Sequence, residues 1–429
     1  MARYLFWPST AKTVALFVLF PSKINSVKLK AGIKFIGLST ALIISACSDN
    51  ASQTTGQAAS NTPCDVGAIT ADDTDRVLNK ANDYLTAKVE TVTANTASRS
   101  AGGPNDFYSE GDYWWPVPGD PDAPYERRDG QTNPDNFTKH RLSMIRFSDI
   151  QGSLASAYLI TGQQKYADAA ATHLKAWFID ADTRMNPNLL YAQAIKGRHT
   201  GRSIGIIDTL HLVEVARAAK LLGDAGAIDP ADYASIKTWF NIYAKWMNTH
   251  PNGIKERDWH NNHSIAWSLQ IAAFADLTGD AALTALVKDK FKNIYLADMM
   301  DANGGFPKEL SRTKPYGYSL FVIDLMAGIA QITSTREDDL WRYSAANGQS
   351  MSLGLDFIKP YVTDKSLWPY AQDVMYWDDW PVRHPSLLLA GDALGDCSYY
   401  DTVKDLAADS DVYEVRRNFP LRHPLIWMN

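Results

Sequence analysis

The segment 258–263 reads DWHNNH and places two histidines and two asparagines directly before an apolar run with helical spacing. A helix N-terminus uses one side chain to accept a hydrogen bond from its free N–H groups. Asn262 could supply that cap, and His263 could be a half-buried histidine held by a hydrogen bond. The other polar groups exceed what capping requires. We therefore expect part of this cluster to line a binding or catalytic site.

A second polar cluster, at 304–321, reads GGFPKELSRTKPYGYSLF. Arg312 and Tyr318 are six residues apart, so a loop or a short helix could bring both to one site. Tyrosine has an ordinary pKa of about 10, and a neighbouring guanidinium favours the phenolate that can act as a base. Tyr316 competes with Tyr318 for that role. Alternatively, Arg312 pairs with Glu309 and Tyr318 packs in the core.

Three further stretches carry aromatic and basic side chains that suit a sugar acid. In 113–137 (YWWPVPGDPDAPYERRDGQTNPDNF), aromatic rings could stack on sugar faces or simply pack a loop. In 196–209 (KGRHTGRSIGIIDT), basic groups could bind carboxylates. The tripeptide RHP occurs at 383–385, where we expect it to line a cleft, and at 422–424, where we expect it to be structural. The candidate substrate-binding residues are Tyr113, Trp114, Trp115, Arg198, His199, Arg202, Tyr316, Arg383 and His384.

The two histidines of the first cluster, His260 and His263, lie at i and i+3 with Asp258 nearby. That spacing could serve a metal ion, but zinc sites need at least three protein ligands and no third strong ligand is evident. We expect neither a metal nor a cofactor.

The composition sets limits on partners. The chain has 429 residues, a formal net charge of −6 and no long basic run, which argues against nucleic acid as a partner. A local basic groove can still bind an anionic polymer on a mildly acidic protein. The 13 Trp and 20 Tyr residues serve packing first, but they also suit sugar stacking.

The N-terminal region resembles a lipoprotein signal. Residues 28–47 (KLKAGIKFIGLSTALIISAC) have a basic start, an apolar stretch too short to span a membrane, and an ending similar to a bacterial lipobox. We expect 1–46 to be a signal region, with 1–27 an extension from a misplaced start, and Cys47 to carry the lipid that is the only membrane contact. An ordinary signal peptide is the alternative. The expected location is the periplasm or outer membrane of a Gram-negative bacterium, or outside the cell.

Residues 47–63 are small and polar, which predicts a flexible tether. Two cysteines follow, Cys64 and Cys397. In an oxidising compartment they could form a disulfide between the start and the end of the domain, although the sequence does not decide that pairing.

Helical hairpins recur along the rest of the chain. Segments 153–178, 215–246 and 268–295 each read as an apolar helix, a glycine break and an amphipathic helix. Further helices fit 318–334, 338–358, 367–375 and 384–407, while 101–137 is a long loop of the kind that is often functional. The pattern predicts an all-α fold, with residues 64–429 forming one solenoid or one (α/α)n toroid or incomplete barrel.

The quoted motifs, in this order from about 105 to 390, resemble the alginate lyase superfamily of α/α-toroid polysaccharide lyases. NNHSIAW and the Arg312–Tyr318 pair are similar to polysaccharide lyase family 5, whereas YWWP and RRDGQTNP are closer to its divergent glucuronan-cleaving relatives. The resemblance implies β-elimination on a polyuronate such as alginate, polymannuronate or glucuronan. In that chemistry Asn262, His263 and Arg312 neutralise the substrate carboxylate.

The same resemblance assigns Tyr318 as the base that removes the C5 proton and the acid that protonates the leaving oxygen. His263 would serve as base for the opposite epimer. Two other functions stay open at this point. A glycoside hydrolase on the same toroid would use a carboxylate pair drawn from Asp208, Asp258 and Glu309. A surface lipoprotein that only binds glycans would keep the aromatic residues and have no use for Arg312 with Tyr318.

Overall fold

The computed structural model describes residues 66–428, with side chains from 73 onward. The expected signal region 1–46, the tether 47–63, Cys47 and Cys64 lie outside the described residues and stay predictions. Cys397 is disulfide-bonded.

The described part of the chain is a series of helices with four short strands. The helices are α1 (Val66–Tyr84), α2 (Lys139–Thr161), α3 (Gln164–Phe178), α4 (Leu212–Asp224), α5 (Pro230–Thr249), α6 (Pro251–Arg257), α7 (Asn262–Thr278), α8 (Ala281–Lys290), α9 (Pro307–Leu310), α10 (Pro315–Thr333), α11 (Met351–Thr363), α12 (Pro385–Leu394), α13 (Cys397–Val403) and α14 (Tyr413–Arg417). A 3₁₀ helix, η2, spans Ser203–Thr209, and a π-helical turn, η3, extends α8 over Phe291–Met299. The strands are β1 (Tyr108–Glu110), β2 (Trp114–Trp115), β3 (Glu126–Arg127) and β4 (Tyr191–Ala194).

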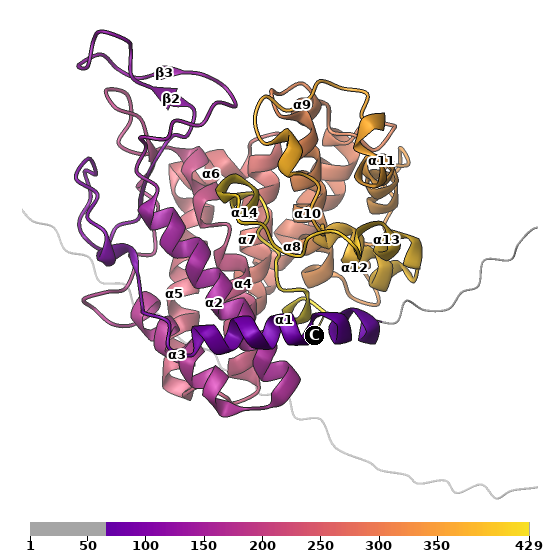
Figure 1. Ribbon diagram of the computed structural model, residues 1–429, viewed down its shortest axis with the longest axis horizontal. Helices are drawn as coiled ribbons and strands as arrows, with labels where there is room; N and C mark the ends of the chain where they lie inside the picture. The colour runs from indigo at the N-terminus through magenta and orange to yellow at the C-terminus, as the bar shows by residue number, and fades with distance from the viewer. Residues whose placement is uncertain (1–65, 429) are drawn as a thin grey trace, which may run out of the picture. The chain divides into compact units, whose positions relative to one another are not determined.

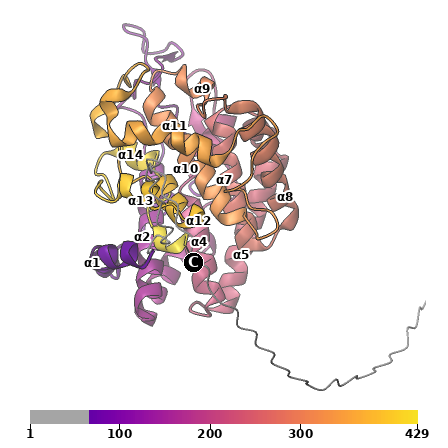
Figure 2. The same ribbon diagram turned by 90° about the vertical axis from the view of Figure 1, so that its right-hand side faces the viewer.

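The helices form two layers. α2, α4, α7, α10 and α12 pack in succession as an inner row, and α1, α3, α5, α8 and α13 cover them from outside (Figures 1 and 2). The inner helices α7 and α10 are apolar almost all round and bury most of their residues, as fully enclosed helices do. α10 is apolar enough to cross a membrane, yet it is a buried core helix here. The all-α toroid predicted from the hairpin repeat is confirmed.

In each predicted hairpin a glycine ends the inner helix or lies in the turn that follows it. Gly162 follows α2 at φ 64°, Gly279 follows α7 at φ 77°, and Gly226 follows α4 at φ 67°. A residue with a Cβ adopts this left-handed conformation at a cost, whereas glycine does not. The next helix of the hairpin then begins after Asp229 or Asp280, whose carboxylates accept hydrogen bonds from its first N–H groups.

The helices predicted near the C-terminal end are partly wrong. Residues 338–350 are a loop with only a few buried side chains, and the helix starts only at 351 because Ser350 caps it by accepting a hydrogen bond from Leu353 N. Residues 367–375 are not helical, since Asp373 there accepts hydrogen bonds from the backbone N–H groups of Tyr316 and Gly317 at the start of α10. The segment 384–407 breaks at Gly395, where φ is 71°.

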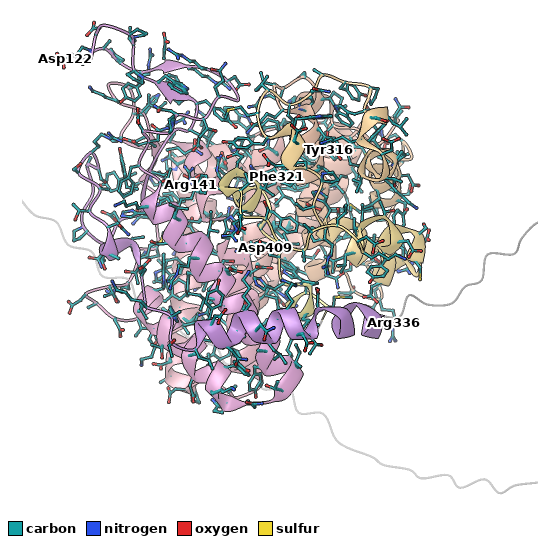
Figure 3. The ribbon with its side chains drawn as sticks, viewed as in Figure 1. Asp122, Arg141, Tyr316, Phe321, Arg336 and Asp409 are labelled. Carbon is teal, nitrogen blue, oxygen red and sulfur yellow. The ribbon has the colours of Figure 1, made fainter. Side chains whose placement is uncertain are left out.

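The long segment 101–137 carries most of the β structure. β1 pairs in parallel with β4, and β2 pairs with β3 as a small antiparallel hairpin in which Trp114 faces Arg127 and Trp115 faces Glu126. Figure 1 shows this hairpin projecting above the helical ends, and Figure 3 shows Asp122 at its outer tip.

The last residues of the chain are anchored in the core by an ionic cluster. His423 lies between two buried carboxylates, with Nδ1 2.7 Å from Glu214 and Nε2 3.2 Å from Asp149. Burial opposes the imidazolium, but Glu214 and Asp149 together raise the pKa of His423 above its ordinary value. The pKa values of both carboxyls are lowered, because burial is outweighed by His423 and Arg422.

These shifts predict how stability depends on pH. A histidine with a raised folded-state pKa stabilises the fold fully below its unfolded pKa of about 6.5, and that contribution falls as pH rises towards the folded value. We expect His423→Gln to lower the free energy of unfolding by about 3 kcal/mol near pH 6, since it removes the cation that lies between two buried carboxylates. Urea unfolding from pH 6 to 9 measures the difference in the free energy of unfolding between the variant and the wild-type protein, which we expect to shrink as pH rises. A gap that stays constant or widens with pH would contradict a charged His423.

Candidate active site

A cavity of about 560 Å³ opens at one end of the helical layers. Its walls come from the β2–β3 hairpin, the start of η2, α6, the first turns of α7 and α10, and the end of α14. Figure 3 places Phe321 of α10 and Arg141 of α2 near the middle of the molecule, below this end. The cavity is thus built from segments that lie far apart in the sequence.

The start of α7 divides its polar residues between capping and the cavity. Asn261 is the N-cap, and its side-chain oxygen accepts a hydrogen bond from His263 N at 3.1 Å. Asn262 and His263, which follow it, belong to the helix and line the cavity. The expectation that Asn262 could be the cap is therefore replaced by Asn261, which leaves the Asn262 amide for another partner.

That partner is Glu309 of α9. Its carboxylate accepts hydrogen bonds from Asn262 N at 2.7 Å and from Asn262 Nδ2 at 2.8 Å. Burial raises the pKa of Glu309, while the bonds from Asn262 oppose the rise. Because a carboxylate accepts and does not donate, it fixes which way the Asn262 amide faces. The second Nδ2 hydrogen stays available to a ligand.

His263 is oriented in the same manner by Glu256 of α6. Nδ1 of His263 is 2.7 Å from Oε1 of Glu256, whose side chain is fully buried. Burial raises the pKa of Glu256, and His263 opposes that rise. With Nδ1 bound to the carboxylate, Nε2 is the ring nitrogen left to act on a ligand.

Two tyrosine hydroxyls meet on the other side of the cavity. The hydroxyl oxygens of Tyr318 on α10 and Tyr113 beside the hairpin are 2.8 Å apart. Arg312 Nη2 donates to the Tyr318 oxygen at 3.3 Å, and its guanidinium also pairs with Asp129 of the hairpin at 3.2 Å. The hairpin is thereby tied to the segment at the start of α10 by the Tyr113–Tyr318 hydrogen bond, the Arg312–Asp129 ion pair and a hydrogen bond from Thr313 to Asp129.

A buried lysine lies beneath these rings. Lys314 Nζ is 5.7 Å from the ring centroid of Tyr318 and 5.3 Å from that of Tyr113, and it pairs with Glu414 at 2.5 Å. Burial raises the pKa of Tyr318 well above its ordinary value, as does Tyr113, whereas Lys314 and then Arg312 act to lower it. Burial therefore favours the protonated phenol, which lies next to two cations that favour loss of the proton.

A buried chain of alternating charges starts at this lysine, and two of its members, Asp112 and Arg417, line the cavity. The contacts run from Lys314 to Glu414, Arg417, Asp112, Arg141 and Asp208, with neighbouring atoms 2.5–3.1 Å apart. Gln193 continues it, because its Nε2 donates to Asp208 at 3.2 Å and its Oε1 accepts from Arg202 at 3.0 Å. Three cations and three carboxylates balance each other, and Arg202 is the additional cation at the end.

Arg202 has only neutral partners. Its Nε and Nη2 donate to the backbone and side-chain oxygens of Gln193, and the structure shows no carboxylate paired with it among residues 73–428. Burial without such a partner lowers the pKa of its guanidinium to about 10. Gln193 holds this position at φ 49°, a left-handed conformation that costs about 1–3 kcal/mol in a non-glycine residue and is common at functional sites.

Eight of the thirteen residues predicted from the sequence line this one cavity: Tyr113, Trp114, His199, Arg202, Asn262, His263, Arg312 and Tyr318. Arg198 and Trp115 lie just outside it. The Arg198 guanidinium packs over the Trp114 ring at 5.4 Å, and Arg128 packs over Trp115 at 5.0 Å. Arg198 and Trp115 thus make cation–π contacts that stabilise the hairpin.

The structure places the other three predicted residues elsewhere, in contacts that explain them. Tyr316 is fully buried, and its hydroxyl donates to Tyr361 O. His384 is buried against Asp324, with Nδ1 2.7 Å from the carboxylate. Arg383 pairs with Asp73 of α1 at 2.8 Å. Their expected position in the cleft is corrected to roles in packing and ion pairing.

Several cavity residues were missed from the sequence. Gln193, Asp112 and Arg417 carry no local signature, because their importance comes from the buried charge chain and from a backbone angle. Lys255 and Trp259 could have been noticed, since Trp259 lies inside the DWHNNH motif.

The carboxylates that a hydrolase would use do not face the cavity. Asp208 is buried against Arg141, Asp258 is exposed and paired with Arg257, and Glu309 holds Asn262. The one carboxylate in the lining is Asp112, which two arginines neutralise. In the part of the chain that the structure describes, no three His, Cys, Asp or Glu side chains form a metal site. His260 instead pairs with Asp298.

Comparisons with known proteins bear on the family and the fold. The family model described as alginate lyase matches residues 91–368. The crystal structure of an alginate lyase from Bacteroides ovatus is similar, with a TM-score of 0.73 and 30% sequence identity over 84% of this chain and 96% of that chain. Alginate lyase A1-III from Sphingomonas species A1 has a TM-score of 0.48 and 17% identity over 73% and 84% of the two chains. No curated protein sequence matches the chain.

The contact between Asn262 and Glu309 gives a structural prediction. Asn262→Ala removes the side-chain hydrogen bond to a buried carboxylate, which keeps only the bond from the backbone N–H, and should cost about 1–3 kcal/mol of stability. Asn262→Asp should cost more at pH 7, because it places a second carboxylate beside Glu309. That extra loss should shrink as pH falls and one of the two carboxyls takes up a proton. Urea unfolding of both variants at pH 5 and 7 tests this. Equal stability of the two variants at pH 7 would show that Glu309 does not hold Asn262.

Proposed function

Because the chain belongs to the alginate lyase family and is a polysaccharide lyase, we propose that its substrate is alginate and that it cleaves the chain by β-elimination at Tyr318. The observation that carries the proposal is the meeting of Tyr318, Asn262, His263 and the unpaired Arg202 around one cavity. The relative from Bacteroides ovatus is an alginate lyase by name, which supports alginate over glucuronan.

The first task of the site is to neutralise the uronate carboxylate. A C5 proton beside a charged carboxylate is a poor acid, and its removal builds a second negative charge. Asn262 offers its second Nδ2 hydrogen, held in place by Glu309, and Arg202 offers a cation with no carboxylate of its own. Arg312 can add its charge when the substrate replaces Asp129 as its anion. Removal of one such preorganised donor typically costs about 10²–10³ in rate.

The second task is proton transfer. The Tyr318 oxygen removes the C5 proton as a phenolate, the C–H electrons form the C4–C5 double bond, and the bond from C4 to the glycosidic oxygen breaks. Tyr318, now protonated, donates to that oxygen when both groups lie on one face of the sugar. Burial favours the protonated phenol, so Lys314 and Arg312 supply the positive charge that the phenolate form requires.

For the epimer whose C5 proton lies on the other face, His263 is the base that we propose. Its Nδ1 is bound to Glu256, which leaves Nε2 for the C5 proton and stabilises the imidazolium that results. Tyr318 then acts only as the acid. The two bases come from two different helices that line the cavity, α7 and α10.

The test compares Tyr318→Phe with Tyr316→Phe on polymannuronate, polyguluronate and glucuronan, with ultraviolet absorbance following the new double bond. We expect Tyr318→Phe to lose about 10²–10⁴ of the rate, the usual contribution of a general acid–base group. Tyr316→Phe is the matched control, since its hydroxyl bonds to Tyr361 O outside the cavity, and it should keep its activity. New reducing ends without a rise in absorbance would mean hydrolysis. A fast Tyr318→Phe enzyme would remove the proposed base, and activity on glucuronan alone would replace the substrate.

A further inference from the structure

One wall of the cavity carries an exposed aromatic ring that the proposed chemistry does not use. Trp259, in the turn between α6 and α7, lines the cavity and is 39% exposed. It is the one tryptophan among the large apolar side chains left exposed in the part of the chain that the structure describes. Indole is usually largely buried, so an exposed ring at a cavity wall calls for a ligand.

A lysine accompanies the ring. Lys255, one turn earlier on α6, lines the same cavity, and its Nζ lies 5.5 Å from the centroid of the Trp259 ring. Within residues 73–428 the structure shows no carboxylate paired with Lys255. Most other cations of the lining differ in this respect, since Arg127 and Arg312 pair with Asp129 and Arg417 pairs with Asp112. Lys255 is thus a positive charge without a carboxylate partner, next to an exposed aromatic ring.

We propose that Trp259 and Lys255 form a separate binding subsite for one uronate residue of the polymer, outside the pair of sugars whose bond is cleaved. The apolar face of the sugar ring stacks on the indole, and its carboxylate binds the Lys255 ammonium. The inference rests on the proposed function, because it takes the ligand to be a polyuronate.

The pair lies on a different element of the fold from Tyr318, the proposed base. Trp259 and Lys255 belong to α6 and the turn that follows, and both are exposed. Tyr318, on α10, is half-buried, and its hydroxyl is hydrogen-bonded to that of Tyr113 beside the hairpin. Asn252 and Asn261 of the neighbouring segments also line the cavity. A neutral sugar could stack on Trp259, but only an acidic sugar uses Lys255, so the pair selects for uronates.

The experiment measures binding of tetramannuronate by titration calorimetry in the full chain, with Tyr318→Phe as the parent so that turnover does not consume the ligand. We expect Trp259→Ala to weaken binding about 3- to 10-fold, the range for loss of one aromatic contact, and Trp259→Phe to restore most of it. Lys255→Met should weaken binding about 2- to 5-fold at low salt, and 0.5 M NaCl should remove that difference but not the one at Trp259.

Two matched controls lie outside the cavity. Tyr370→Ala removes another exposed aromatic ring, and Lys245→Met removes another exposed lysine, so neither should change binding. A parent protein that binds neutral mannotetraose as tightly as tetramannuronate would overturn the selection for uronates. Unchanged binding in Trp259→Ala, or no binding by the parent, would overturn the subsite. Absorbance from double-bond formation judges the lyase chemistry separately, so the two proposals can fail independently.

Discussion

The buried chain of alternating charges from Lys314 to Asp208 is the constraint on which the site depends. A buried charge is tolerated when it is paired, and removal of one partner strands the other at a cost of about 3–5 kcal/mol. Each member of the chain therefore fixes the next: Glu414 and Arg417 of α14, Asp112 beside β1, and Arg141 of α2. Because these elements come from distant parts of the sequence, the ion pairs hold in register the segments that form the cavity.

The charge balance of that chain explains the character of the cavity. Its carboxylates are all matched within the chain, so they do not repel an anionic ligand. Arg202, reached through the neutral Gln193, is left without a carboxylate, and burial makes that state unfavourable until an anion arrives. Arg312 forms an ion pair with Asp129 of the hairpin, which a ligand carboxylate could replace. A uronate carboxylate therefore enters a cavity where one arginine has no carboxylate partner and another has an exchangeable one.

The sequence predicted the fold well where local rules decide it. Apolar helices broken at Gly162 and Gly279 gave the hairpins, and the DWHNNH and Arg312–Tyr318 motifs gave the centre of the site. It failed where a distant partner decides, as at Asp373, whose carboxylate caps α10 instead of joining a helix of its own. Tyr316 and His384 looked available in the sequence, but Tyr361 and Asp324 engage them in the core. The role of Gln193 could not be predicted from the sequence, because it depends on the left-handed backbone angle at that position.

The most direct test is the crystal structure of the Tyr318→Phe protein with tetramannuronate bound. The account predicts a sugar carboxylate within hydrogen-bond distance of Asn262 and of Arg202 or Arg312, with C5 of that sugar facing the ring at position 318. A sugar bound in the cavity with its carboxylate turned to solvent, away from Asn262 and the free arginine, would contradict the account.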